Sequence, residues 1–210
     1  MLTLYGAAGS GSAAVEAALE ICAVPFRIVD AASWHTGPGV EELARVNPLR
    51  QIPTLRRDDG SVLSESAAIL IHLGLAHPAS GLLPAAPGPR DQAIRGLVYI
   101  AANCYAAIGV IDYPERWCVD GDDAVKASIR AGARRRLHGC WEIFADLFGA
   151  ATPFIGGAAP GALDLLAAVV SKWSGSRQHL AGARPAFAAL LQRIDAQPRV
   201  AAVFARHWPK

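Results

Sequence analysis

Short runs of bulky apolar residues alternate with turn residues in the first third of the chain. Residues 2–5 and Phe26–Asp30 are runs of the kind found in strands, and Gly or Pro lies close to each. Between them, apolar residues with helical spacing predict one buried helix face, formed by Val15, Ala18, Leu19 and Cys22. A second helix is expected at residues 40–46. This order predicts a βαβ unit with a right-handed crossover.

Residues 47–73 predict a β-hairpin followed by a helix. The motif QIPTL opens the first strand, DDG forms the turn, SVL forms the second strand, and Glu65-Ser66 begins an apolar helix. Pro53 has no N–H for a sheet ladder, so the backbone before it stays available to another partner. A cis Ile52–Pro53 bond would turn these groups outward, where they could pair with an extended peptide. A plain hairpin and a capped helix would explain either feature alone, but together they favour a peptide-binding site.

The rest of the chain has only the helical period. Helices are expected at residues 91–111, 123–148, 162–173, 185–195 and 199–207. The stretch HPASGLLPAAPGP, residues 77–89, is dense in Pro and Gly and is typical of a linker. The chain is therefore predicted to contain an α/β domain at residues 1–78 and an all-helical domain at residues 89–210.

Composition narrows the function classes. The 210 residues carry a formal charge of +2, which favours neither nucleic acid nor an anionic membrane as partner. No uninterrupted apolar run approaches the roughly 18–20 residues of a spanning helix, and the start lacks a secretory signal pattern, so a cytoplasmic protein is expected. The four cysteines have neither CxxC nor metal-ligand spacing, which predicts reduced thiols and no metal site. The only dense basic cluster, residues 134–136, is expected to be a solvated helix face.

The QIPTL and Glu-Ser motifs, in this order of elements, resemble the cytosolic glutathione S-transferase family, in particular bacterial members with a serine in the first loop. The resemblance covers essentially the whole chain. It implies a thioredoxin-like glutathione-binding domain followed by an all-α domain, and a cytoplasmic homodimer. A second similar segment is PGALDLL, where Asp164 stands at the family's capping position and Gly161 replaces the usual Ser or Thr. Asp164 is therefore expected to be structural.

The first loop is expected to activate the glutathione thiol. A free thiol has a pKa of about 8.5, so little thiolate exists at neutral pH, and each unit of lowering represents about 1.4 kcal/mol. A hydroxyl and a helix N-terminus can both stabilise the anion, and the loop GSGS offers both. Ser10 stands at the position of the family's serine, but the loop is one residue shorter than usual. Ser10 and Ser12 therefore remain alternatives, and either could simply cap the helix.

The resemblance implies the remaining glutathione contacts. Ile52, before Pro53, would bond the cysteinyl backbone. Ser66 would hold the γ-glutamyl carboxylate at a helix start, and Glu65 would pair with the ammonium. The glycyl end would meet two further residues, Gln51 and His35.

A second substrate is expected between the domains. An aromatic wall with some polar groups suits a small hydrophobic electrophile, and its candidate residues are Tyr99, Asn103, Tyr105, Tyr113 and Trp117. The same residues could instead pack between helices. The predicted function is a glutathione S-transferase with glutathione as co-substrate and no cofactor, active in conjugation, reduction or isomerisation. The alternative is a non-catalytic binding or regulatory module of the same fold.

Overall fold

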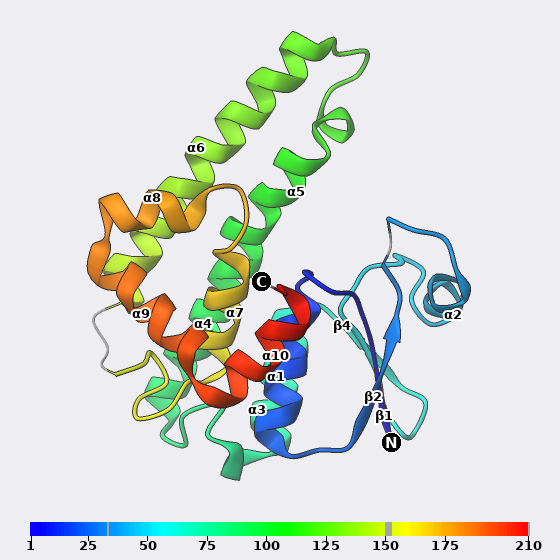
Figure 1. Cartoon of the computed structure of the whole chain (residues 1–210), viewed down its shortest axis with the longest axis vertical. Helices are drawn as coiled ribbons and strands as arrows, with labels where there is room; N and C mark the ends of the chain where they lie inside the picture. Colours follow the sequence, from blue (N-terminus) through cyan, green and yellow to red (C-terminus); the bar gives the residue numbers. More distant parts are fainter. Residues whose placement is uncertain (33, 150–152, 210) are drawn as a thin grey trace.

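The computed structural model describes residues 1–32, 34–149 and 153–209 (Figure 1). A four-stranded sheet has the order β2-β1-β3-β4. β1 runs parallel to β2 and antiparallel to β3, and β3 is antiparallel to β4. The strands are β1 (Leu2–Gly6), β2 (Phe26–Asp30), β3 (Thr54–Arg56) and β4 (Val62–Ser64). The predicted βαβ unit and hairpin are both present.

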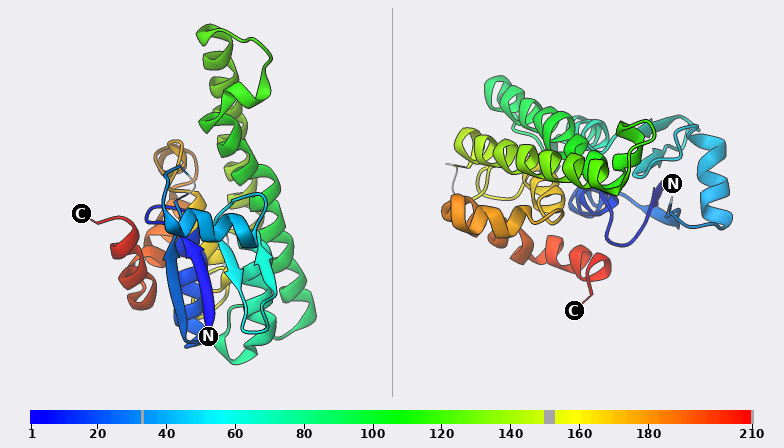
Figure 2. Two further views of the ribbon diagram at one scale, coloured as in Figure 1. Left: turned by 90° about the vertical axis from the view of Figure 1, so that its right-hand side faces the viewer. Right: turned by 90° about the horizontal axis from the view of Figure 1, so that it is seen from above.

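The two faces of the sheet are covered by different helices, because successive side chains of a strand point to opposite faces. Leu4 belongs to the large core that also contains residues of α1 (Ser12–Cys22) and α3 (Ser66–Ala76). Tyr5 packs on the other face against α2 (Pro38–Val46), where its hydroxyl donates to Glu42 Oε1 at 2.7 Å. Figure 2 shows α2 lying across that face. This arrangement confirms the thioredoxin-like expectation.

The second part of the chain is helical, as expected. A continuous helix runs from Pro87 to Asp112, and α5 and α6 extend beyond the rest of the molecule (Figure 1). The elements are α4 (Pro87–Tyr99), a π-helical turn (Ile100–Tyr105), α5 (Ala106–Asp112), α6 (Asp123–Phe148), α7 (Ala162–Val170), α8 (Ser176–Ala183), α9 (Pro185–Ala196) and α10 (Pro198–His207), with short 3₁₀ turns at Pro78–Ser80 and Pro114–Trp117.

Two boundaries differ from the expectation. The stretch predicted as a linker is docked: Leu82 and Leu83 are buried, and α4 already begins at Pro87. The helix expected at residues 162–173 ends earlier, at Val170, and α8 was not expected at all. Ser174 and Gly175, beyond the end of α7, adopt left-handed φ values of 56° and 77°, and Gly175 is the residue before α8.

α7 is the centre of the molecule. All nine of its residues are buried, and it packs against α1 and α3 as well as against α4 and α9. Asp164, in this helix, is fully buried and accepts backbone N–H groups from Ile155, Gly156 and Gly161 at 2.8, 2.7 and 2.9 Å. A buried carboxylate requires such partners, so the structural role expected for Asp164 is confirmed.

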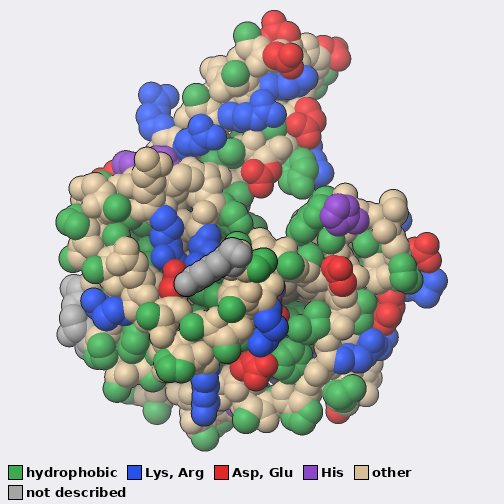
Figure 3. All heavy atoms as spheres, in the orientation of Figure 1, with side chains coloured by type: hydrophobic (Ala, Val, Ile, Leu, Met, Phe, Trp, Pro, Cys, Tyr) green, Lys and Arg blue, Asp and Glu red, His purple; other side chains and the backbone are tan. Residues whose placement is uncertain are grey.

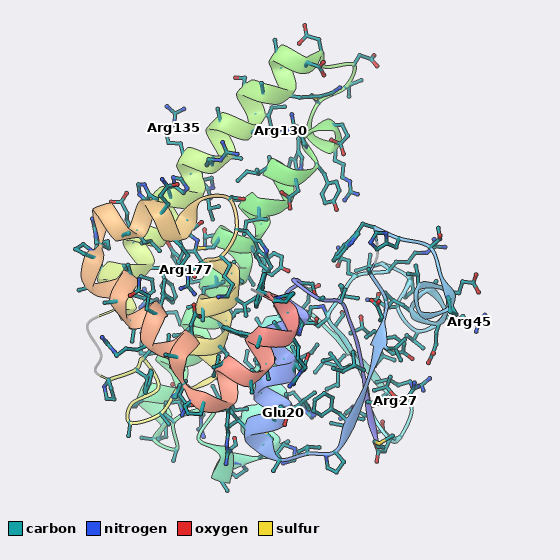
Figure 4. All side chains as sticks on the ribbon, in the orientation of Figure 1. Glu20, Arg27, Arg45, Arg130, Arg135 and Arg177 are labelled. Carbon is teal, nitrogen blue, oxygen red and sulfur yellow. The ribbon has the colours of Figure 1, made fainter. Side chains whose placement is uncertain are left out.

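Charged side chains separate into paired, half-buried groups and solvated ones. Arg177 is half-buried in the helical part, where its guanidinium donates to Asp195 and to the Ser171 hydroxyl (Figure 4). Arg130 and Arg135 instead project from α6 into solvent. Residues 134–136 are all exposed, as predicted for a solvated face.

Pro87–Asp112 is the one helical stretch, among the described residues, whose length and composition would allow it to cross a membrane. In this structure it packs within the protein, with Leu97, Ile100 and Cys104 fully buried. All four cysteines are free thiols. Among the described residues, no group of three or more His, Cys, Asp or Glu side chains could hold a metal ion.

Candidate functional site

A cavity of about 770 Å³ lies between the α/β part and the helical part. Figure 3 shows the surface hollowed between α5 and α2. Small-molecule sites typically have volumes of about 300–1,000 Å³. The α/β part contributes Gly9, Ser10, Gly11, Trp34, Gln51, Ile52, Pro53, Glu65 and Ser66 to the lining. The helical part contributes Ala101, Tyr105, Ala106, Ile108, Gly109, Asp112, Tyr113, Arg116, Trp117 and Trp173.

The two serines of the first loop occupy different places. Ser10 lines the cavity with 7% of its surface exposed, whereas Ser12 is 1% exposed and does not line it. Ser12 Oγ accepts from Ala7 N at 3.2 Å, which ties the loop to the end of β1. The geometry therefore distinguishes a cavity-facing serine from one that supports the loop.

The Ser10 hydroxyl has hydrogen-bond partners within its own loop. Its oxygen lies 2.8 Å from Ala7 O and 2.8 Å from Ser12 Oγ, and it accepts from Ser12 N at 3.2 Å. Ser12 Oγ also lies 3.2 Å from Ala7 O, so the Ser12 hydroxyl can donate to that carbonyl without help from Ser10. The Ser10 proton could then turn toward a ligand without leaving Ala7 O unpaired.

The segment before β3 presents its backbone to the cavity. The Ile52–Pro53 bond is cis, as expected, and Gln51, Ile52 and Pro53 all line the cavity. Asn47 fixes this segment, because its side-chain amide donates to Gln51 O at 3.2 Å and to Thr54 Oγ1 at 2.9 Å. Sequence reasoning gave Asn47 no role. The Asn-Pro pair at residues 47–48 was the available signal.

The start of α3 forms another wall of the cavity. Glu65, the residue before the helix, has φ 66° and ψ 114°, a conformation that non-glycine residues rarely adopt. Such strain persists where the surrounding structure imposes it, and it is often found at ligand sites. Ser66 begins the helix, and no side chain caps this end. The exposed helix N–H groups and their partial positive charge suit an anionic group.

The helical wall is aromatic and carries two charges. The Arg116 guanidinium lies 4.0 Å from the centre of the Tyr113 ring, a cation–π contact. Asp112 lies beside them, and burial raises the pKa of its carboxyl. Two tryptophans, Trp34 and Trp173, also face the cavity but were not predicted as site residues.

Four predicted site residues do not line the cavity: Ser12, His35, Tyr99 and Asn103. The Tyr99 hydroxyl donates to Cys140 O at 3.0 Å, and burial raises its pKa to about 12. Asn103 donates to Tyr99 O at 3.2 Å within the same helix, so only the Tyr99 hydroxyl serves a contact between helices. His35 lies beside Trp34, with ring centres 6.2 Å apart. The other nine predicted residues are brought together in this one cavity.

Comparison with known proteins gives a match in sequence. Residues 12–75 match the family model for the glutathione S-transferase N-terminal domain. The chain is 33% identical over 130 residues to the uncharacterised GST-like protein YncG of Escherichia coli (strain K12). That match covers 61% of this chain and 63% of YncG, so it spans less than two thirds of the relative's length.

Solved structures extend the similarity to nearly the whole chain. A glutathione transferase homolog from Sulfitobacter, with bound glutathione, is 25% identical with a TM-score of 0.82, covering 97% of this chain and 96% of that one. A glutathione S-transferase from Methylobacterium radiotolerans, in complex with glutathione sulfonate, is 27% identical with a TM-score of 0.77, covering 97% and 94%. The chain therefore has the glutathione transferase fold, and its residues 12–75 match the sequence of that family's N-terminal domain.

Proposed function

We propose that this protein is a glutathione S-transferase, which binds glutathione and activates its thiol for attack on a small hydrophobic electrophile. The observation that carries the proposal is the set of residues that line one cavity. The first loop, the segment around Pro53 and the start of α3 meet there, facing an aromatic wall. Glutathione is bound in the Sulfitobacter homolog, whose fold this chain shares.

In the proposed complex, glutathione lies along the α/β wall. The Asn47 side chain holds the segment around Ile52 in place, and the Ile52 backbone bonds the cysteinyl residue as a neighbouring strand would. Ser66 and the exposed N–H groups of α3 receive the γ-glutamyl carboxylate, while Glu65 pairs with the ammonium. Gln51 then reaches the glycyl end.

The thiol of this complex would lie at the first loop. Ser10 donates to the sulfur, since it is the loop serine that lines the cavity, and Ser12 supports the loop from behind. The N-terminus of α1, at Gly11, adds partial positive charge. Both effects favour thiolate over thiol and so lower the thiol pKa.

The second substrate would occupy the space before the aromatic wall. Tyr105, Tyr113 and Trp117 offer flat apolar surface to a small electrophile. Arg116 adds a cation beside Tyr113, which favours an electrophile that carries an acceptor or a negative charge.

Two measurements test the function. Calorimetric titration should show one glutathione site per chain, and turnover of an aryl halide with glutathione should exceed the uncatalysed rate. Absence of glutathione binding would refute the proposal. Binding without turnover of any electrophile would favour the non-catalytic module instead. One observation supports that alternative: the Ser10 hydroxyl already has partners within its own loop, Ala7 O and Ser12 Oγ.

A further inference from the structure

The long helix beside the cavity contains one π-helical turn, at Ile100–Tyr105. This wider turn joins α4 to α5 without a break. Such turns are rare in proteins and occur frequently at functional sites. Here the turn ends on Tyr105, where the helix passes the first loop of the α/β part.

The Tyr105 hydroxyl occupies the space in front of Gly11. A Cβ placed on Gly11 would lie 2.5 Å from Tyr105 Oη, closer than non-bonded atoms approach. Gly11 has φ −61° and ψ −15°, which are ordinary right-handed values open to any residue. Its lack of a side chain therefore serves the close approach of this hydroxyl rather than a special backbone conformation.

This hydroxyl is held in place, yet it has no hydrogen-bond partner among the residues that the structure describes. The Tyr105 ring packs on Trp173, with ring centres 5.6 Å apart. The Tyr5 and Tyr99 hydroxyls donate to protein oxygens, but Tyr105 Oη bonds no protein group within residues 1–32, 34–149 and 153–209. Burial, with smaller contributions from Asp112 and Glu65, raises the pKa of Tyr105 to about 12, so it remains a hydrogen-bond donor at neutral pH.

The hydroxyl therefore meets the requirements for a ligand donor better than either loop serine. Ser10 must give up a bond to Ala7 O or Ser12 Oγ before it can donate outward, whereas Tyr105 gives up none. Both line the same cavity, and Gly11, which follows Ser10, is the residue that Tyr105 touches.

We propose that Tyr105 is a catalytic residue whose hydroxyl donates a hydrogen bond to the glutathione sulfur across Gly11, alongside Ser10. The assignment rests on the proposed function. On activation the thiol proton passes to solvent, and Tyr105 keeps its own proton while donating the hydrogen bond. Gly11 is then a positioning residue, because it leaves the space that the hydroxyl needs.

The test is the pKa of bound glutathione, followed by the ultraviolet absorbance of its thiolate against pH. Tyr105→Phe removes the hydroxyl but keeps the ring that packs on Trp173, and it should raise the bound thiol pKa by about one unit, a tenfold loss of thiolate at a fixed pH below that pKa. Tyr5→Phe removes a hydroxyl on the far face of the sheet and should leave that pKa unchanged. Thermal unfolding verifies that both variants are folded.

The Gly11→Ala variant gives a second, independent test of the Tyr105 assignment. Its added methyl group should displace the hydroxyl and raise the thiol pKa in the wild-type background, but have no further effect in the Tyr105→Phe background. An unchanged thiol pKa in Tyr105→Phe overturns the assignment, and so does a fall in the turnover of an electrophile without a pKa change, since the hydroxyl would then serve the electrophile. Calorimetry on the wild-type protein comes first: failure to bind glutathione refutes the proposed function itself.

Discussion

Ser10 and Ser12 lie two residues apart and bond each other, yet their environments give them different roles. Ser10 lines the cavity, while Ser12 faces the interior and holds Ala7 N. A buried donor that loses its acceptor costs about 1–3 kcal/mol. Removal of the Ser12 hydroxyl leaves Ala7 N without its acceptor and should therefore lower the stability of the fold. Removal of the Ser10 hydroxyl leaves Ala7 O with a donor in Ser12 but takes an acceptor from Ser12 N, so we expect it to affect the ligand and also to lower stability.

We therefore expect Ser10→Ala to raise the bound thiol pKa by roughly one to two units, because a hydrogen bond to a charged acceptor contributes about 1.5–3 kcal/mol. Ser12→Ala should lower the free energy of unfolding by about 1–3 kcal/mol and shift the thiol pKa less. Thiolate absorbance and chemical denaturation measure the two effects. A pKa shift confined to Ser12→Ala would reverse these roles.

Residue types and spacing could predict most single-residue features of the cavity, but not its side-chain directions. The motifs that contain Pro53 and Ser66 are local in sequence, so the sequence reveals them, and both residues line the cavity. Tyr99 and Tyr105 are both aromatic residues of one helix, and only the packing decides that Tyr99 bonds Cys140 while Tyr105 faces Gly11. Trp34 and Trp173 join the site from loops that carry no motif.

At the scale of elements, two helices direct their N-terminal ends into one cavity. α1 begins next to Gly11, and α3 begins at Ser66 after the strained Glu65. Each end carries partial positive charge, so the cavity favours a ligand with negative charge at two points, although the first N–H groups of α1 already bond Ser10 and Gly11. Glutathione has that property when its thiol is ionised.

Ser66→Ala and Glu65→Ala should each weaken glutathione binding by about ten- to a hundredfold, since each removes a hydrogen bond to a charged group. Both should change the melting temperature little, because neither side chain caps the helix. Calorimetric titration compares them with Ser64→Ala, a neighbouring serine that does not line the cavity. Unchanged affinity in both variants would show that the start of α3 does not contact the ligand.

The contact between α1 and α10 should depend on pH. Burial alone would raise the pKa of Glu16, but hydrogen bonds from His207 at 2.7 Å and from Arg206 outweigh it, so the pKa is lowered. A carboxyl with a depressed folded pKa stabilises the protein above its unfolded pKa of about 4.3, and that stability is lost as the pH falls through the folded value.

Glu16→Gln should therefore remove part of the fall in stability below about pH 4.3. The measurement is the free energy of unfolding in denaturant at a series of pH values. Glu20→Gln is the matched control, because Glu20 lies on the same helix and contacts the same Arg206 but is exposed (Figure 4). Identical pH profiles for wild type and Glu16→Gln would contradict the account.

The sequence could predict elements where a period of two or 3.6 extends over several residues. α6 was predicted at its observed bounds, and β2 likewise, because turn residues mark their ends: Pro25 precedes β2, and Asp122 and Gly149 flank α6. α8 was missed, because its eight residues carry a weak pattern; the residue before it, Gly175, has a left-handed φ of 77°. The π-helical turn at Ile100–Tyr105 has no signature in the order of apolar residues, so a plain helix was expected there.

For the whole molecule, the resemblance implies a homodimer, and we expect its interface to involve exposed apolar side chains of three helices. Large apolar side chains are exposed on three helices that pack together, α3, α4 and α6; they are Leu75, Val98, Ile143 and Leu147. Light scattering at micromolar concentration should give twice the mass of one chain. Val98→Glu with Ile143→Glu should give the single-chain mass, whereas Val119→Glu, at a residue 92% exposed, should not. A monomeric wild-type protein would exclude the dimer.

The burial of α1 connects the two parts of the molecule. Every residue from Ser12 to Leu19 is buried, because α7 and α10 cover the sides that the sheet and α3 leave open. A fragment ending at residue 78 would lack both covering helices and expose that apolar surface to water, where it would favour aggregation over a stable fold. The α/β part is therefore no autonomous folding unit. Heat or denaturant should melt both parts in a single cooperative transition, and the first loop, at the start of α1, should form only when α10 is in place.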